Sequence, residues 1–349
     1  MTLKQAFHRQ AEACSELGSP FTACLLRLCG DRLRAGTPLT DRLFAWPGDI
    51  SGAGASLPLR LAGGLHALVR SGQSVDLSAA YPPNDVTDAT LWPAVEAAMD
   101  AHHDFLNRWI DSPPQTNELR RSAVLIAAAH WLTDHFQMPL VLSELGASAG
   151  LNLLWDQYDL EINGARWGQN RAHLTLRPDW RGPTPPQAQV QIKERRGIDL
   201  NPLNPQDESD QLRLLSYLWA DQDERINNTR KALQLPPAPV DQGDAVDWLE
   251  QRLNTPHPGH IHLIYHTIAW QYFSAERQQR GEEIIAQALK NATPDAPVVR
   301  LSVEADGDVR GTGGAAITAQ ISPDPHPVPL GRTDFHGRWT DWAPPEISP

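Results

Sequence analysis

The sequence predicts an α/β protein in which a helical amino-terminal part precedes a Rossmann-like parallel sheet. Residues 1 to about 110 carry apolar side chains at helical spacing, whereas later residues alternate short apolar runs with helix-compatible stretches. The apolar run 139–142 leads through Glu144 into a turn of small residues, 146–150, and then into a helix-compatible stretch. A strand, a glycine-bearing turn and a helix in this order form the first unit of a nucleotide-binding sheet.

The amino-terminal helices are predicted from apolar periodicity and from the breaks between periodic stretches. Apolar residues recur at helical spacing over residues 3–17 and 21–33, and a Gly-Ser-Pro sequence separates the two stretches. Two further helices are expected at 57–71 and 92–110. We assign residues 1–115 to a helical cap that covers the crevice of the sheet and selects the substrate. Residues 116–349 then form the sheet domain.

A proline-rich segment, residues 112–118, joins the helices to the rest of the chain. Thr116 or Asn117 at its end is suited to cap a helix expected at 119–136. The alternative interpretation is a polar cluster, formed by Asn117, Glu118 and Arg121, that contacts the substrate.

Composition restricts the class of partner. The chain has 349 residues, 41% of them hydrophobic, and a formal net charge of -12, so it can form a sizeable core but lacks the positive charge of a general nucleic-acid binder. A small molecule is the expected partner. The amino end has no signal-peptide pattern and no stretch approaches the roughly 20 apolar residues of a membrane span, so cytoplasm is the expected location. The three cysteines are too few and wrongly spaced for a disulfide framework or a zinc site, and no metal is expected.

Seven sheet strands are predicted, with a β-hairpin at 158–167 inserted after the first. They are expected at 139–142, 190–198, 240–245, 260–265, 298–304, 316–321 and 335–342, the last two antiparallel. Residues 323–329 are interpreted as a proline-rich connection, and residues 207–235 as one long helix.

Two residues at predicted strand ends are candidates for chemistry. Asp199 ends the second strand, where nucleotide-binding sheets hold ribose hydroxyls, since a carboxylate accepts two hydrogen bonds from a diol. An Asx turn is the alternative for this residue. His266 ends the fourth strand beside the crevice and is a candidate general base or substrate contact, the alternative being a structural histidine.

The glycine turn matches neither a dinucleotide nor a P-loop fingerprint, because it lacks G-x-G-x-x-G spacing and a following G-K-[ST]. The string E-L-G-A-S-A-G-L-N resembles the first motif of class I S-adenosylmethionine-dependent methyltransferases. That resemblance implies a seven-stranded methyltransferase-type sheet and S-adenosylmethionine as cofactor, bound by Glu144, Gly146, Ser148 and Gly150, with Ser148 in place of a middle glycine. It also implies that Asp244 and Ala245 meet the adenine; Asp244 is equally suited to cap a helix.

A second resemblance covers nearly the whole chain. The strings L-G-S-P-F-T-A, L-P-L-R-L-A-G-G-L-H, S-P-P-Q-T-N-E-L-R-R-S-A and E-L-G-A-S-A-G-L-N-L-L are similar to those of a bacterial family catalogued as domain of unknown function 2332. This resemblance implies no activity.

Three functions follow as hypotheses. The first is methyl transfer from S-adenosylmethionine to an unidentified small molecule, with His266 as base. The second is a serine hydrolase, because residues 146–150 also spell the G-x-S-x-G elbow, with Ser148 as nucleophile, His336 or His266 as base and Asp244 as acid. The third is a non-catalytic protein that binds an adenosyl ligand. The sequence leaves the methyl acceptor, the pathway and the oligomeric state open.

Overall fold

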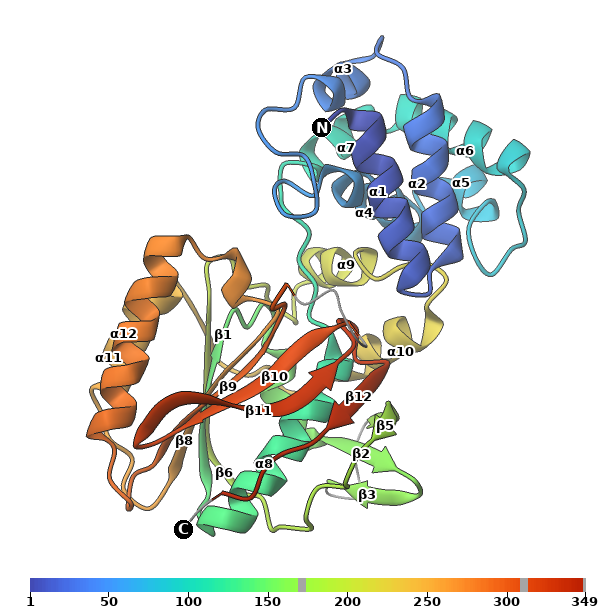
Figure 1. Cartoon of the computed structure of the whole chain (residues 1–349). Coiled ribbons are helices and arrows are strands. Elements are labelled where there is room, and N and C mark those ends of the chain that lie inside the picture. The colour runs from blue at the N-terminus through green and yellow to red at the C-terminus, as the bar shows by residue number, and fades with distance from the viewer. Residues whose placement is uncertain (169–173, 308–312, 348–349) are drawn as a thin grey trace. The chain divides into compact units, whose positions relative to one another are not determined.

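A computed structural model describes residues 1–168, 174–307 and 313–347, and the chain forms two compact units (Figure 1). Unit 1 comprises Met1–Thr116 and Gln206–Arg230. Unit 2 comprises Asn117–Pro205 and Lys231–Pro349. Residues 206–230 therefore join the amino-terminal helices although they come late in the chain.

Unit 1 is helical, as the apolar periodicity predicts. Its helices are α1 (Leu3–Glu16), α2 (Pro20–Arg32), α3 (Pro38–Phe44), α4 (Leu57–Arg70), α5 (Val75–Ala79), α6 (Asp88–Ala101), α7 (His103–Trp109) and α9 (Glu208–Ser216). Thr2 and Gln5 form a capping box at the start of α1, and Ser19 caps α2 ahead of a proline in its first turn. Leucines such as Leu26, Leu61 and Leu65 are fully buried in the shared core.

The helix predicted over residues 207–235 is wrong, because two helices form there. Helix α9 ends at Ser216 and α10 (Asp223–Ala232) begins after an irregular segment. In that segment Asp221 accepts hydrogen bonds from the hydroxyl of Ser19 and, at 2.9 Å, from the backbone N–H of Phe21. These hydrogen bonds hold Asp221 at the start of α2, and such tertiary contacts override the local preference for a continuous helix.

Unit 2 is a mixed α/β structure around a large sheet. The strands in that sheet are β1 (Leu140–Leu145), β5 (Asp179–Arg181), β6 (Ile192–Asp199), β7 (Val240–Gln242), β8 (Ile261–Thr267), β9 (Val298–Glu304), β10 (Ala315–Ile321), β11 (Asp324–Thr333) and β12 (Trp339–Trp342). Their order is β5-β12-β11-β10-β9-β8-β1-β6-β7, and β7, β6, β1, β8 and β9 run parallel. The chain leaves β1 toward β6 and β7 and then returns to β8 on the other side, so the order reverses between β1 and β8.

The sheet has nine strands instead of the predicted seven. The seven expected strands are present, and the additional strands are β5 and β11. Strand β11 covers the proline-rich segment that was interpreted as a connection, and it separates β10 from β12. The expected antiparallel pairing of these two strands is therefore wrong: each pairs antiparallel with β11, so β10 and β12 run in the same direction. Prolines are tolerated there because β12 pairs with β11 only at Gly331, Arg332 and Thr333, which leaves one side of the Pro325–Pro329 stretch without a partner strand.

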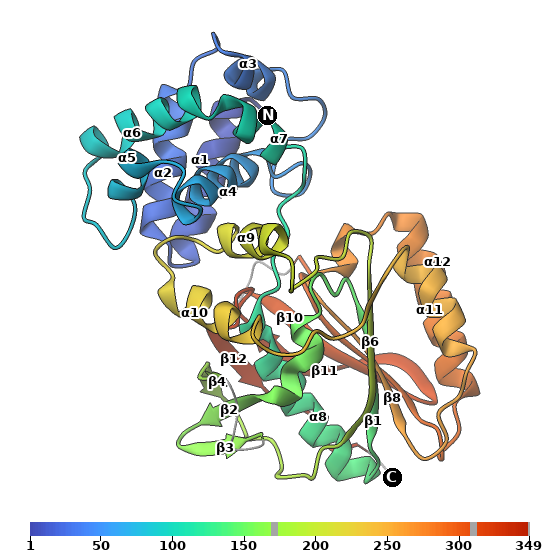
Figure 2. The same cartoon turned by 180° about the vertical axis from the view of Figure 1, so that it is seen from behind.

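Helices cover both faces of the parallel part of the sheet (Figures 1 and 2). Helix α8 (Ser122–Phe136) lies on one face, and α11 (Ala245–Leu253) and α12 (Ala275–Asn291) lie on the other, where Ile264, Ile285 and Leu289 form a buried cluster. The predicted hairpin is confirmed as β2 (Tyr158–Ile162) and β3 (Ala165–Trp167), which form a small sheet with β4 (Leu174–Leu176).

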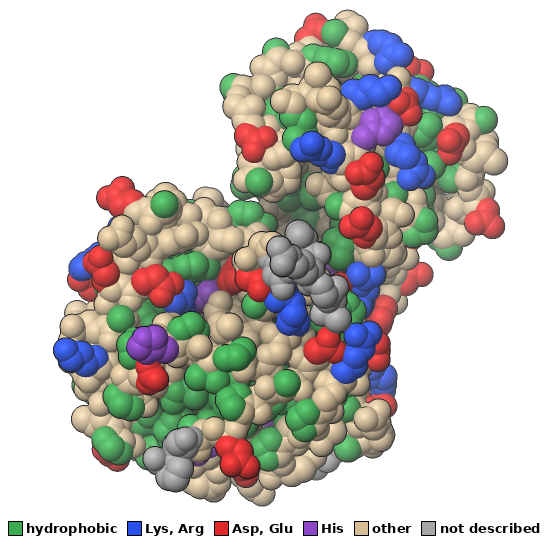
Figure 3. Space-filling view, viewed as in Figure 1, with side chains coloured by type: hydrophobic (Ala, Val, Ile, Leu, Met, Phe, Trp, Pro, Cys, Tyr) green, Lys and Arg blue, Asp and Glu red, His purple; other side chains and the backbone are tan. Residues whose placement is uncertain are grey.

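Three shorter helical segments, η1 (Leu119–Arg121), η2 (Leu151–Gln157) and η3 (Trp270–Tyr272), are 3-10 helices. The helix expected directly after the glycine turn is therefore the 3-10 segment η2. Within the described ranges no helix is long and apolar enough to cross a membrane. Acidic and basic side chains are interspersed on the face drawn in Figure 3.

Buried histidines should make the protein sensitive to mild acid. Burial lowers the pKa of His66 and His130 to about 4 and that of His262 to about 3, from an ordinary 6.5. Below pH 6.5 the unfolded chain takes up protons that the folded protein does not, so each histidine lowers the free energy of unfolding by up to about 1.4 kcal/mol per pH unit down to its folded pKa. Urea unfolding at pH 7.5, 6.5, 5.5 and 4.5 measures this loss. A free energy of unfolding that stays constant from pH 6.5 to 4.5 would contradict the expectation.

Unit 1 should need both of its chain segments. A chain lacking residues 1–116 retains α9 without α4, so Leu214 and Tyr217, which are buried in unit 1, become exposed and the protein should aggregate. A chain lacking residues 1–116 and 206–230, with a flexible Gly/Ser linker in place of the second segment, should be monomeric and folded. Size-exclusion chromatography and circular dichroism compare the two. A soluble, folded monomer from the first deletion alone would show that the two segments are independent.

Candidate functional site

The carboxyl ends of β6, β1 and β8 meet where the strand order reverses. Glu144 near the end of β1 pairs with Gly197 on one side and Tyr265 on the other. In open parallel sheets such a reversal leaves a crevice at the carboxyl ends of the strands, because successive connections depart to opposite sides. The candidate site lies at this edge of unit 2.

The glycine turn depends on backbone conformations that few residues adopt. Gly146, Ser148 and Gly150 have φ of 72°, 54° and 72°. Positive φ is unstrained for glycine, whereas Ser148 is held there by its surroundings. A Cβ on Gly150 would lie 2.8 Å from Val240, so this glycine is also needed for close packing.

Asp199 holds the turn through its carboxylate. The backbone N–H of Ser148 donates to Oδ2 at 2.8 Å, and that of Asn201 donates to Oδ1 at 2.9 Å. The second bond is the Asx contact that was the alternative for Asp199. Each carboxylate oxygen accepts more than one hydrogen bond, so the half-buried Asp199 retains capacity for a ligand.

Glu144 is a buried carboxylic acid. Its side chain belongs to a residue that is 2% exposed, and among the described residues Oε2 has no hydrogen-bond partner. Burial, and secondarily the charge of Asp199, raise the pKa of Glu144 well above 4.5, although Arg121 acts in the opposite direction. Burial therefore favours the protonated form of Glu144 over a wider range of pH than for an exposed glutamate.

The residues proposed as a polar cluster support the turn and the strand ends. Asn117 Oδ1 accepts from the backbone N–H of Leu151 at 2.9 Å, at the start of η2. Glu118 caps η1 by accepting from the N–H of Arg120 at 3.2 Å. Arg121 donates to the carbonyls of Thr267, at 3.0 Å, and Phe335, at 2.9 Å.

Asn117, Glu118 and Arg121 are all buried. The hydrogen bonds given above join them to backbone groups of the protein, Glu118 also pairs with the side chain of Arg120 at 3.5 Å, and contact with a substrate stays a prediction.

His266 is fully buried with both ring nitrogens engaged. Nδ1 lies 2.7 Å from Glu304 Oε1, and Arg300 Nε donates to Nε2 at 3.0 Å, which fixes the neutral tautomer with its proton on Nδ1. Burial, followed by the charge of Arg300, lowers the pKa of His266. Its predicted role as a base would require one of these contacts to break.

Glu304, at the end of β9, was not predicted as a site residue. Besides His266, its Oε1 accepts from the backbone N–H groups of Ala269, at 2.9 Å, and Trp270, at 3.1 Å. Burial raises the pKa of Glu304, but the hydrogen bond with His266, the interaction with its charged form and the two backbone N–H groups together outweigh that effect, so the pKa is lowered overall. The same rule that selected Asp199, an acid at a strand's carboxyl end, would have found it.

Asp244 and Ala245 lie at the start of α11. Asp244 caps this helix by accepting from the N–H of Val246 at 2.8 Å, which was the alternative for this residue, and it also pairs with Arg277. Ala245, the first residue of the helix, is buried. A contact of either residue with adenine stays a prediction.

The three groups of the hydrolase hypothesis are not joined by the hydrogen bonds that a catalytic triad requires. Within the described ranges Ser148 Oγ is buried and has no hydrogen-bond partner, so no histidine activates it. His336 lies in the turn between β11 and β12, where its backbone N–H donates to Asp334 Oδ1 at 2.9 Å. The charge partner of Asp244 is Arg277.

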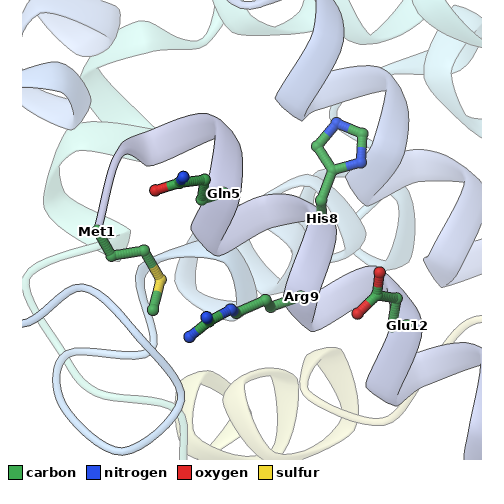
Figure 4. Close-up of a pocket in the computed structure, with 5 residues that line it drawn as sticks. All are labelled: Met1, Gln5, His8, Arg9 and Glu12. Atoms are coloured by element: carbon green, nitrogen blue, oxygen red, sulfur yellow. The ribbon is translucent and has the colours of Figure 1, made fainter.

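A pocket in unit 1 lies beside α1 (Figure 4). It is lined by Met1, Gln5, His8, Arg9 and Glu12. Most of these side chains are exposed, and His8 already contacts Asp31 at 3.0 Å, so we do not regard it as the candidate site. In the part of the chain that the structure describes, no group of three or more His, Cys, Asp or Glu side chains is placed to hold a metal ion.

The fold defines an α/β protein whose strand order reverses at the carboxyl edge of its parallel strands. Residues 4–342 match the model of a family described as uncharacterized protein conserved in bacteria (DUF2332). The chain belongs to this family, as its sequence strings predicted. Neither a curated protein nor a solved structure matches it.

Replacing Glu144 with glutamine should stabilise the protein at neutral and alkaline pH. Because the folded pKa of Glu144 is raised above 4.5, the unfolded chain releases a proton above that pH and stability falls as pH rises. Glutamine cannot ionise, so the free energy of unfolding of Glu144→Gln should exceed that of the wild type. This difference should grow by up to about 1.4 kcal/mol per pH unit above 4.5. Chemical unfolding between pH 4.5 and 8 measures the margin.

Glu304→Gln is the matched control, because its expected change in stability at neutral pH has the opposite sign. The pKa of Glu304 is lowered, so its carboxylate contributes stability that is fully present above pH 4.5 and is lost as pH falls through the folded pKa. The variant should be less stable than wild type at pH 7 and approach it in acid. If both variants change stability in the same direction at pH 8, the assignment of protonation states is wrong.

Proposed function

We propose that this protein binds S-adenosylmethionine at the carboxyl edge of its sheet and transfers the methyl group to a small molecule. The observation that carries the proposal is Asp199, an acid at the end of the strand beside β1, bonded to the middle of the glycine turn. This arrangement, at the point where the strand order reverses, is where α/β sheets bind nucleotides. The resemblance of the turn to the first methyltransferase motif favours the adenosyl class.

The chemistry of the site is compatible with such a ligand. Glu144 Oε2 and Ser148 Oγ are buried polar atoms without partners among the described residues, and each can donate or accept a hydrogen bond. Asp199 has lone pairs left for a diol. An adenosyl ligand offers ribose hydroxyls, an amino group and ring nitrogens, all of which need partners of this kind.

The roles of the protein's own residues follow from their contacts. Asp199 would accept from the ribose hydroxyls while retaining the Ser148 amide, and residues 146–150 would pass the methionine part. Asp244 and Ala245 would meet the adenine. When bound, the cofactor supplies an electrophilic methyl group, so the protein mainly has to align the acceptor with it and exclude water.

If the methyl acceptor carries a proton, a base has to remove it. We propose that His266 is this base, which requires the hydrogen bond from Arg300 to His266 to break. Because both ring nitrogens of His266 are engaged, a non-catalytic adenosyl-ligand-binding protein is the second candidate. An acceptor that reacts without losing a proton would make a base unnecessary.

The proposal predicts that S-adenosylhomocysteine binds to the intact protein and that Asp199→Ala weakens binding by about 1 to 3 kcal/mol, the cost of leaving a buried diol unpaired. Calorimetry with S-adenosylhomocysteine, NAD and ATP measures the preference. Asp199→Asn serves as the matched variant, because it preserves shape while removing the charge. Unchanged affinity in a folded Asp199→Ala variant would exclude this residue from the site.

Ser148 separates the adenosyl hypotheses from the hydrolase hypothesis. In an adenosyl-binding site Ser148→Ala should leave affinity within about 1 kcal/mol, the usual size of one net hydrogen bond. In a hydrolase the same change removes the nucleophile and lowers ester turnover by roughly a million-fold. Fluorophosphonate labelling of wild type that disappears in Ser148→Ala, with no binding of adenosyl ligands, would overturn the proposal.

A further inference from the structure

Helix α4 of unit 1 contains two adjacent glycines in its interior, in the string L-A-G-G-L-H, that have no part in the proposed function. Glycine inside a helix is less favourable than alanine, so a packing reason is expected. A Cβ on Gly63 would lie 2.4 Å from the ring of Tyr217, and one on Gly64 would lie 3.0 Å from the ring of Trp109. The glycine pair therefore lets these two aromatic side chains pack directly against α4.

Three neighbouring groups from α7 and the α9 region meet at this place. The ring centroids of Trp109 and Tyr217 are 5.8 Å apart, and the guanidinium carbon of Arg213 lies 4.7 Å from the centroid of the Trp109 ring. His66 Nδ1, also on α4, lies 3.1 Å from the carbonyl oxygen of Ser216 and fixes the segment that carries Tyr217.

The polar atoms of this cluster are buried and lack partners. Trp109 and Tyr217 are each 6% exposed. Trp109 Nε1, the Tyr217 hydroxyl and one terminal nitrogen of Arg213 make no hydrogen bond of good geometry with the residues that the structure describes, although the Trp109 indole N–H lies close enough to the Tyr217 hydroxyl to lower its pKa. Trp109 and Arg213 can only donate, and the tyrosine hydroxyl can donate as well. An unpaired buried donor is unfavourable, most of all a charged one, so an acceptor is expected at this cluster.

Two guanidinium groups act on the Tyr217 hydroxyl. Burial raises the pKa of Tyr217, while Arg213 and then Arg60 act to lower it. Arg60 is held by the carbonyls of Ala55, at 2.6 Å, and Ile110, at 2.8 Å, and the charge of Asp111 offsets part of its own.

We propose that Arg213, Tyr217 and Trp109 bind the oxyanion of a small carboxylate or phosphate. An oxyanion is a charged acceptor with several lone pairs, so one group can satisfy all three donors. Phe105 stacks on Trp109 with ring centroids 5.6 Å apart and extends the apolar surface beside the donors.

The test is titration of the intact protein with inorganic phosphate and, separately, with acetate, at constant ionic strength, followed by calorimetry. Saturable binding of either anion is expected. Tyr217→Phe should weaken it about 3- to 10-fold, the effect of one hydrogen bond, and Arg213→Gln at least about 10-fold, because a charge-assisted bond is lost. Binding of phosphate alone identifies a phosphate site, and binding of acetate alone identifies a carboxylate site.

Tyr81→Phe is the matched control. Tyr81 has another buried hydroxyl in unit 1 without a partner among the described residues, and its ring lies against Phe21 instead of an arginine. This variant should bind the anion as wild type does. Should Arg213→Gln fail to fold, Arg213→Lys keeps the charge but loses the planar fork and should still weaken binding. The absence of saturable binding, an equal loss in Tyr81→Phe and Tyr217→Phe, or full affinity in a folded Arg213→Gln variant would overturn the proposal.

Discussion

The hydrogen bond from the Ser148 N–H to Asp199 joins the ends of two neighbouring parallel strands, and the geometry of the sheet edge depends on it. Ser148 has a φ of 54°, a conformation that costs a non-glycine residue roughly 1 to 3 kcal/mol. The turn persists because several bonds hold it: the N–H groups of Gly146 and Ala147 also donate to the carbonyl of Ile198. A change in the pairing of β1 with β6 would therefore alter the turn as well.

The sheet edge is fixed from both faces. Successive residues of a strand point to opposite faces, so Tyr265 and His266 of β8 belong to different networks. Tyr265 donates to the carbonyl of Asn152 at 3.1 Å, whereas His266 contacts Glu304 and Arg300. Directly after β8 the chain passes through Ile268 at a φ of 54°, which is unusual for a β-branched residue. We infer that the buried polar groups preserve this conformation, because no local preference of isoleucine favours it.

Local sequence signals predicted the elements but not their distant partners. Strands β1 and β8 were predicted because continuous apolar runs specify buried strands, and the Asn163–Gly164 turn specifies the hairpin. Strand β11 was missed because prolines argue against a strand unless one side of it is open. The helix predicted at 207–235 is interrupted because Asp221 bonds to residues about 200 positions earlier, which periodicity cannot reveal.

The same limit applies to the candidate site. Asp199 was expected to contact a ligand or to form an Asx turn, and Asp244 to contact a ligand or to cap a helix. The Asx turn and the helix cap are both present. The sequence predicted Asn117 as a possible cap of the helix that follows it. Its side chain instead accepts a hydrogen bond from the backbone N–H of Leu151, at the start of η2. Glu304 could have been selected by its place at a strand end, whereas the raised pKa of Glu144 follows from burial that only the folded chain reveals.

The unpartnered atoms of the two proposed sites differ in kind, and this difference has a chemical consequence. At the sheet edge of unit 2 they belong to a buried carboxyl group and a hydroxyl, those of Glu144 and Ser148. In the cluster of Trp109, Arg213 and Tyr217 in unit 1 they belong to an indole, a guanidinium and a phenol, which supply donors beside the charge of Arg213. A ligand rich in hydroxyl and amino groups finds partners at the first place, next to the carboxylate of Asp199, but leaves the charge of Arg213 unneutralised at the second. An oxyanion would be repelled by Asp199 and stabilised by Arg213, so the two places should select different ligands and can be tested separately.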